Sequence, residues 1–188
     1  MNQILKYTFL LFLLSCKQEN TSKSLIRNTK TEHSSEINKI PEKNKLVIRT
    51  VKEFGPKISP TYEKAVCTEL VIQILEKIQP LNAIDKQRIR IITDENIQQL
   101  LKDNSDIPKG VYFALIKKDV GIPIDNINEV CEGDFVQFWT ETWGHCGIIK
   151  SIDIKKNEME LYSSFPSTQG YGIQKFTVPH YVYFVRLK

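Results

Sequence analysis

The chain has 188 residues and a net charge of +4 at pH 7, with 41% apolar and 26% charged residues. This length favours one domain, and this composition is typical of a globular core rather than of a disordered chain. The basic residues are scattered and form no long block of like charge. That distribution argues against a nucleic-acid-binding face.

The N-terminal segment predicts export and lipid anchoring. Residues 7–14 form an apolar stretch that is too short to span a bilayer. Directly after it, Ser15 precedes Cys16, which resembles the bacterial lipobox. The resemblance implies that residues 1–15 are removed as a signal peptide and that Cys16 is acylated. The protein is then expected in the bacterial cell envelope, on the periplasmic or surface face of the outer membrane. The alternative is an ordinary signal peptide in which Cys16 is incidental.

The next segment, residues 16–44, is rich in polar residues and predicts a flexible tether to a domain over residues 45–188. The first half of that domain has helical periodicity. Gly55-Pro56 is expected to stop the first helix, and Thr61 is expected to cap the second. The expected helices cover residues 46–54, 62–78, about 95–102 and 111–118, with 84–92 as a short helix or strand.

After Gly133 the pattern changes to short β-branched and aromatic runs separated by turn residues. These runs predict an antiparallel meander. The expected strands cover residues 134–140, 144–153, 157–163, 171–177 and 181–187. The last run is apolar on both faces, which predicts a central strand. The fold class is therefore α+β, with N-terminal helices packed on an antiparallel sheet of about five strands.

Apart from Cys16, the chain has three cysteines, Cys67, Cys131 and Cys146. An odd number leaves at least one thiol free or paired outside the chain. Cys131 and Cys146 lie at the outer ends of the first two strands, so a bridge between them would leave Cys67 free. The alternative is three reduced, buried thiols. Adjacent residues on a strand, such as His145 and Cys146, point to opposite faces and make poor metal co-ligands, so no metal or other cofactor is expected.

Cys67 lies near the start of an expected helix and shares its apolar stripe with Val71 and Ile74. A core cysteine would occupy the same position, so the stripe leaves a structural role open. A functional role is also open, because free N–H groups at a helix start lower the pKa of a thiol and can hold an oxyanion. His145 opens the second strand and is a candidate general base.

The order of these segments resembles the NlpC-type and CHAP-type cysteine peptidases. It combines Cys67 on a helix, G-D-F-V at residues 133–136 and G-H-C-G-I-I at residues 144–149. The resemblance implies a papain-like fold over about residues 46–188 and cleavage of amide bonds in peptidoglycan. Cys67 would be the nucleophile and His145 the general base, without a cofactor. The segment around Cys67, A-V-C-T-E-L, departs from the family's usual D-C-S-G.

The resemblance also implies a third residue that orients the imidazole from the next strand. Residues 162–164 are expected opposite His145, where Ser164 is favoured over Ser163 and Glu160 is a further candidate. The family normally offers His, Asn, Gln, Asp or Glu at this position. A serine hydroxyl stabilises an imidazolium less than a carboxylate does.

Four aromatic residues are candidate substrate contacts: Tyr62, Trp139, Trp143 and Tyr171. Tyr62 resembles an upstream tyrosine of some family members, but it could also be a half-buried helix residue. The two tryptophans flank the turn before His145, where they could line a cleft or lie at the edge of the core. Residues 82–130 are expected to cover one flank of the cleft.

The sequence thus predicts a membrane-anchored, monomeric cysteine hydrolase that acts on peptidoglycan peptides. An endopeptidase, an amidase and a transferase would share the same motif pair. Two alternatives stay open. One is a non-catalytic lipoprotein of the same fold that binds cell-wall peptide or a protein partner. The other is a secreted antibacterial amidase toxin.

Overall fold

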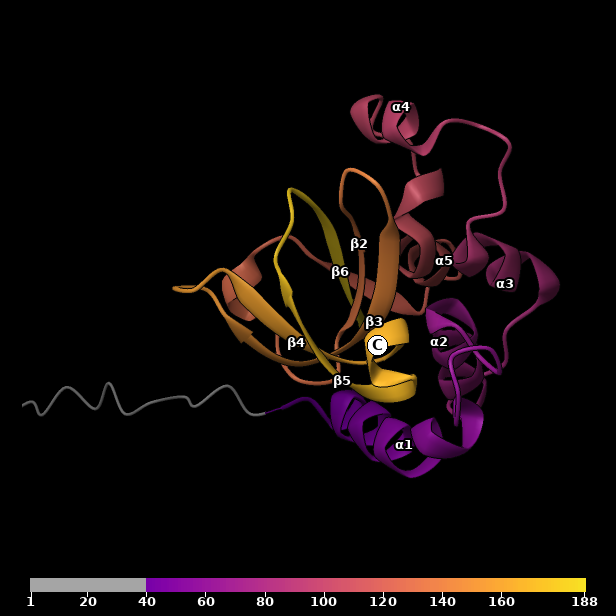
Figure 1. The fold of residues 1–188 in the computed structure, drawn as a ribbon, viewed down its shortest axis with the longest axis vertical. Helices are drawn as coiled ribbons and strands as arrows, with labels where there is room; N and C mark the ends of the chain where they lie inside the picture. The colour runs from indigo at the N-terminus through magenta and orange to yellow at the C-terminus, as the bar shows by residue number, and fades with distance from the viewer. Residues whose placement is uncertain (1–39) are drawn as a thin grey trace, which may run out of the picture. The chain divides into compact units, whose positions relative to one another are not determined.

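Five α-helices and a six-stranded antiparallel sheet make up residues 40–188, the part of the chain that the computed structural model describes (Figure 1). The expected α+β class is confirmed. The helices are α1 (Glu42–Ile58), α2 (Cys67–Glu76), α3 (Ala83–Arg90), α4 (Ile97–Lys102) and α5 (Gly110–Lys117). The strands are β1 (Gly121–Ile124), β2 (Phe135–Trp139), β3 (Gly144–Asp153), β4 (Glu158–Phe165), β5 (Gly170–Thr177) and β6 (Tyr181–Leu187).

The predicted signal peptide, the lipidation site Cys16 and most of the predicted tether lie outside the described residues. The tether was expected to reach residue 44, but α1 already begins at Glu42. Asn44, at the end of the expected tether, is fully buried. The domain boundary predicted at residue 45 is therefore a few residues too late. Within residues 40–188, no helix has both the length and the apolar character needed to cross a membrane.

The sheet has the strand order β1-β6-β2-β3-β4-β5. Strands β2 to β5 form the expected meander, but β6 does not pair with β5. It returns to lie between β2 and β1, which confirms its predicted central position and corrects its predicted neighbour. Strand β1 was missed, because it has only four residues and includes Pro123. A proline is tolerated there because β1 is an edge strand.

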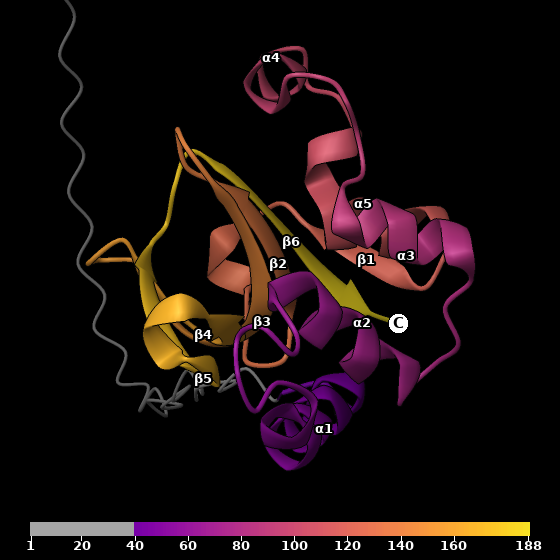
Figure 2. The same cartoon turned by 45° about the vertical axis from the view of Figure 1, so that its right-hand side comes forward.

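The two faces of the sheet bury two separate apolar clusters. On one face, side chains such as Phe135, Ile148 and Val185 pack against α1, α2 and α5. The helices α1, α2, α3 and α5 gather on one side of the strands (Figures 1 and 2). On the other face, Phe138, Leu161 and other apolar side chains from all the strands pack together. The sheet curves around this second cluster, and strand alternation assigns each residue to one cluster or the other.

Helix α1 continues through Gly55-Pro56, where the sequence predicted its end, and closes at Ile58. The proline lies in the last turn, where the loss of one backbone hydrogen bond interrupts little helix. The glycine has a packing role. A Cβ atom on Gly55 would lie 2.4 Å from the Tyr171 ring of β5. Absence of a side chain at this position therefore lets α1 lie directly against the sheet edge.

Replacement of Gly55 by alanine should lower the free energy of unfolding by about 1–3 kcal/mol, the cost of overpacking a filled core. Helix propensity alone would favour alanine by about 1 kcal/mol, so a net loss identifies the collision with Tyr171. Urea denaturation measures the difference. The control is Glu53→Ala in the same helix, because Glu53 is exposed and its loss should change stability little. Equal stabilities of the two variants would contradict the close packing.

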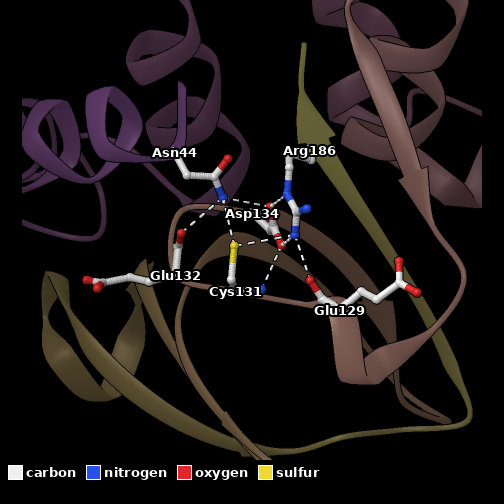
Figure 3. Close-up of polar contacts among 6 residues, drawn as sticks. All are labelled: Asn44, Glu129, Cys131, Glu132, Asp134 and Arg186. Atoms are coloured by element: carbon white, nitrogen blue, oxygen red, sulfur yellow. Dashed lines mark hydrogen bonds and ion pairs between the residues drawn. The ribbon is translucent and has the colours of Figure 1, made fainter. Parts of the chain in front are cut away.

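A polar cluster ties the start of α1 to the sheet (Figure 3). Its centre is Asp134, which is fully buried at the entrance to β2. The Arg186 side chain on β6 donates to both Asp134 carboxylate oxygens at 2.8 Å, and Asn44 Nδ2 donates to one of them at 2.7 Å. The Cys131 thiol accepts from Asn44 at 3.4 Å and from Arg186 at 3.3 Å. Asp134, in the predicted G-D strand start, is thus a structural anchor.

Candidate active site

Cys67 is the first residue of α2, so the helix begins five residues later than predicted. Thr61 does not cap it; the N-cap position is Val66, which makes no side-chain cap. The preceding loop is held instead by Ser59, whose hydroxyl donates to the Ala65 carbonyl at 2.8 Å. The backbone N–H groups of the first helical turn have no partner within the helix. The Cys67 sulfur therefore lies at the positive end of the α2 dipole.

The N-terminal end of β3 faces the start of α2. Strand β3 pairs with β2 from Gly144 onward but with β4 only from Ile148 onward. Over residues 144–147, β3 therefore has no ladder pairing with β4, although Gly147 still lies close to Ser163. Both Cys67 and Cys146 line the hollow at this place and pack against the same helix-side cluster. Cys146 is fully buried and Cys67 is half-buried.

The contacts with β3 lower the pKa of the Cys67 thiol well below its ordinary value. The largest cause is a hydrogen bond with the Cys146 side chain. A hydrogen bond with the His145 imidazole, the charge of that ring and the Cys146 backbone N–H act in the same direction, and burial opposes them. The pKa of the Cys146 thiol is raised well above its ordinary value by the hydrogen bond with Cys67, by burial and by the charge of Cys67. The thiolate of the pair therefore belongs on Cys67.

His145 lies on the opposite face of β3 from Cys146, among aromatic rings. Its imidazole centroid is 5.0 Å from that of Phe165 and 5.1 Å from that of Phe176, and only 3% of the residue is exposed. Its Nε2 atom is buried and has no hydrogen-bond partner in the described part of the chain. The ring is thus positioned by aromatic packing rather than by a polar third residue.

The predicted third residue, Ser164, does not orient the imidazole. Strand alternation places Ser164 on the helix side of β4, and its hydroxyl is hydrogen-bonded to that of Ser59 at 2.8 Å. It supports the loop that precedes Cys67. Ser163 lies on the His145 side, but its buried hydroxyl also has no partner among residues 40–188. Glu160 binds Lys150 at 2.7 Å and pairs with Ser151, so it too is excluded as the orienting residue.

Three of the four predicted aromatic contacts lie near the site. Burial raises the pKa of Tyr62, and the nearby charges of Cys67 and Cys146 raise it further. The phenol therefore lies near the two thiols. Trp139 lines the hollow beside Cys67, and its Nε1 donates to the Pro108 carbonyl at 2.7 Å. A Cβ atom on Gly144 would lie 2.5 Å from the Trp139 ring, so the glycine lets this ring cover the mouth of β3.

Trp143 and Tyr171 differ in their positions. Trp143 is 40% exposed and packs edge-on to Phe138 in the aromatic cluster that surrounds His145. Tyr171 packs on Gly55 of α1, and its backbone N–H donates to the Ser59 carbonyl at 2.8 Å. Burial raises the pKa of Tyr171 to about 12. The Tyr171 ring therefore packs in the interface between α1 and the sheet, and its role as a substrate contact stays a prediction.

The site opens into hollows on two sides. One is lined by Cys67, His145, Trp139 and the segment from Arg90 to Ile97 that joins α3 to α4. The other lies beside Tyr62, between residues 60–63 and residues 166–169. The segment between the predicted nucleophile and base therefore supplies one wall of the cleft. Arg90 on that wall is held by Glu69, whose carboxylate accepts from it at 2.6 and 3.1 Å.

The sequence left two states open for the cysteines, a bridge between Cys131 and Cys146 or three reduced thiols, and the structure has the second. All three described cysteines are free. Cys131 belongs to the Asp134 cluster, whereas Cys146 faces Cys67, because β3 carries Cys146 toward α2 and away from the segment before β2. Burial, followed by the charge of Asp134, raises the pKa of the Cys131 thiol to about 11. No group of three or more potential ligands that could hold a metal ion occurs in residues 40–188.

Two residues of the site were missed by sequence reasoning. Cys146 makes the largest contribution to lowering the pKa of Cys67. Gln137 on β2 is 2% exposed, and its Nε2 donates to the His145 carbonyl at 3.0 Å, so it holds the backbone of the predicted base. The available signal was a single polar residue within the apolar strand F-V-Q-F-W.

Searches with the sequence found no match to a protein-family model and no match to a curated protein.

Proposed function

We propose that this protein is a cysteine hydrolase of papain-like, NlpC or CHAP type that cleaves an amide bond, with peptidoglycan peptides as its substrate. The observation that carries the proposal is the position of Cys67 at the start of α2, in one hollow with His145 of β3, where its contacts lower the pKa of the thiol. Further support comes from the direct pairing of the G-D strand with the G-H strand. A helix-borne thiolate, a neighbouring imidazole and an open cleft are the parts that acyl transfer requires.

In the proposed reaction, the Cys67 thiolate attacks the carbonyl carbon of the substrate. The oxyanion that forms is stabilised by the Cys67 backbone N–H at the helix start. The C–N bond then breaks, and the leaving amine takes a proton from His145. In the second half, His145 removes a proton from water, which attacks the acyl carbon and releases the Cys67 sulfur. Because Nε2 of His145 is enclosed by aromatic rings, we assign these proton transfers to Nδ1.

The proposed location is the bacterial cell envelope, with the domain anchored to the membrane through a lipid on Cys16. Support comes from the apolar stretch and the lipobox-like cysteine in the sequence. An anchored hydrolase of this kind would meet peptidoglycan directly. The anchor and the reaction are separate proposals, because neither depends on the residues that support the other.

A second candidate function is a non-catalytic lipoprotein that binds wall peptide or a protein partner in the same cleft. The observation that favours it is the buried Nε2 of His145, which has no partner in residues 40–188. An imidazolium without an acceptor on its second nitrogen is less stable than one that has such an acceptor. The two candidates differ in the reactivity that they predict for Cys67.

Alkylation of Cys67 by iodoacetamide tests the proposal, with rates read for each cysteine by peptide mass spectrometry. The pKa of Cys67 is lowered, so its thiolate persists below the ordinary thiol pKa of about 8.5. We therefore expect rapid alkylation of Cys67 at pH 7. Cys131 is the internal control, because its pKa of about 11 predicts slow reaction at the same pH.

In His145→Ala, a hydrogen bond and a positive charge that lower the pKa of Cys67 are lost. The alkylation rate at pH 7 should therefore fall and should recover as the pH rises toward 9. A Cys67 rate that first rises above pH 8.5 and does not change in His145→Ala would contradict the hydrolase and support the binding protein. Release of fragments from peptidoglycan by the wild-type protein then tests the substrate class.

A further inference from the structure

The candidate active site holds two thiols in contact with each other. Cys67 and Cys146 line one hollow, and their side chains are hydrogen-bonded. They lie 79 positions apart in the sequence and come together because α2 packs against β3 on the helix side of the sheet. The third described cysteine, Cys131, lies in the Asp134 cluster and is not part of this pair.

The two thiols differ in access and in charge. Cys67 is half-buried at the start of α2 and carries the thiolate, whereas Cys146 is completely buried and holds its proton. An oxidant that enters the cleft would therefore meet the Cys67 sulfur first, in its nucleophilic form. Cys146 is then placed as the second thiol, in contact with the oxidised sulfur and sheltered from solvent.

We propose that Cys67 and Cys146 form a reversible oxidation site, in which a hydroperoxide converts Cys67 to a sulfenic acid and Cys146 resolves it to a disulfide. This inference needs a reactive Cys67 but does not need the protein to hydrolyse anything. If the proposed hydrolase is correct, the disulfide removes its nucleophile, so oxidation would switch the enzyme off and a thiol reductant would switch it on again.

The chemistry balances with the peroxide as the oxidant. The Cys67 sulfur attacks one peroxide oxygen, an S–O bond forms, the O–O bond breaks, and the other oxygen leaves as hydroxide or an alkoxide. Cys67 loses two electrons and the peroxide gains them. The Cys146 sulfur then attacks the Cys67 sulfur, the S–O bond breaks, and water leaves with the Cys146 proton. The sulfur atoms must approach to about 2 Å for this bond.

The test treats the purified full chain with one equivalent of hydrogen peroxide near neutral pH, blocks free thiols and digests with trypsin. Trypsin releases residues 65–77, which hold Cys67, and residues 119–150, which hold Cys146. The proposed disulfide should join these two peptides. A thiol reductant should separate the two peptides. Since the second peptide also holds Cys131, two serine variants identify the partner.

Cys131→Ser is the matched control and should still form the linked peptide. Cys146→Ser should lose the link and should accumulate a sulfenic acid at Cys67 that dimedone traps. Absence of the linked peptide from oxidised wild-type protein would overturn the proposal, even if Cys146→Ser failed to fold. A link that persists in Cys146→Ser and disappears in Cys131→Ser would overturn it as well.

The outcomes also separate this proposal from the proposed function. Rapid alkylation of Cys67 with no disulfide after peroxide would refute the oxidation site and leave the hydrolase standing. Formation of the disulfide in a protein that never cleaves peptidoglycan would refute the hydrolase and leave the oxidation site standing.

Discussion

Replacement of Cys67 by alanine should abolish the release of peptidoglycan fragments, with a loss on the order of 10⁴-fold to 10⁶-fold in turnover. The thiolate that starts the reaction is absent, and no other described thiol can substitute for it. Cys146 is completely buried and the pKa of its thiol is raised, while Cys131 lies in the Asp134 cluster. The measurement is the rate of soluble fragment release from purified peptidoglycan.

Stability provides the check that this loss is chemical. Cys67 is half-buried, so its truncation should cost at most about 1 kcal/mol of unfolding free energy, as for other small changes of volume. The matched control is Cys131→Ala, which should keep its turnover because Cys131 lies outside the cleft. Full activity in Cys67→Ala would refute the proposed nucleophile. An equal loss in both variants would point to a folding defect instead.

Replacement of Asp134 by alanine should destabilise the domain by about 3–5 kcal/mol. The substitution leaves the Arg186 guanidinium without its carboxylate and removes one of the three acceptors of Asn44 Nδ2 (Figure 3). A partly buried charge that loses a fully buried partner costs more than an exposed one, because water replaces that partner incompletely. Chemical denaturation measures the effect, and the domain has only about 5–15 kcal/mol of stability to lose.

The control for this prediction is another aspartate in an ion pair with a basic residue. Asp119 binds Lys188, but its side chain is 90% exposed. Asp119→Ala should therefore change the unfolding free energy by about 0–1 kcal/mol. Similar losses in the two variants would mean that the Asp134 cluster is no stronger than a surface pair. The anchoring role assigned to the G-D strand start would then be wrong.

The fold class and most strands could be predicted from sequence because they depend on local patterns. Period-two alternation and turn residues located β2 to β6 to within a few residues. Helical periodicity located α1, α2, α4 and α5, whereas the segment of α3 matched either a short helix or a strand. The prediction failed at Gly55-Pro56, where a tertiary contact with Tyr171 decides the structure. It also failed for β1, which is too short for an alternation to register.

The site was predicted in part, and its errors have one geometric cause. The sequence placed Cys67 at a helix start and His145 at the mouth of a strand. It could not show which face of β3 meets α2, since a shift of one residue exchanges the two faces. Consequently a bridge between Cys131 and Cys146 stayed open beside three reduced thiols, and Ser164 was assigned to the imidazole. Both points depend on strand register, which no local pattern encodes.

The position of β6 also constrains when the domain can form. The last strand of this chain lies between β1 and β2, and its Arg186 completes the cluster that holds Asn44 at the other end of the domain. Until residues 181–187 have emerged, β1 has no partner and Asp134 has no counter-ion. Such long-range pairings are formed late and slow folding. A chain that is being synthesised or passed through a channel from its N-terminus should therefore remain unfolded until its last strand arrives.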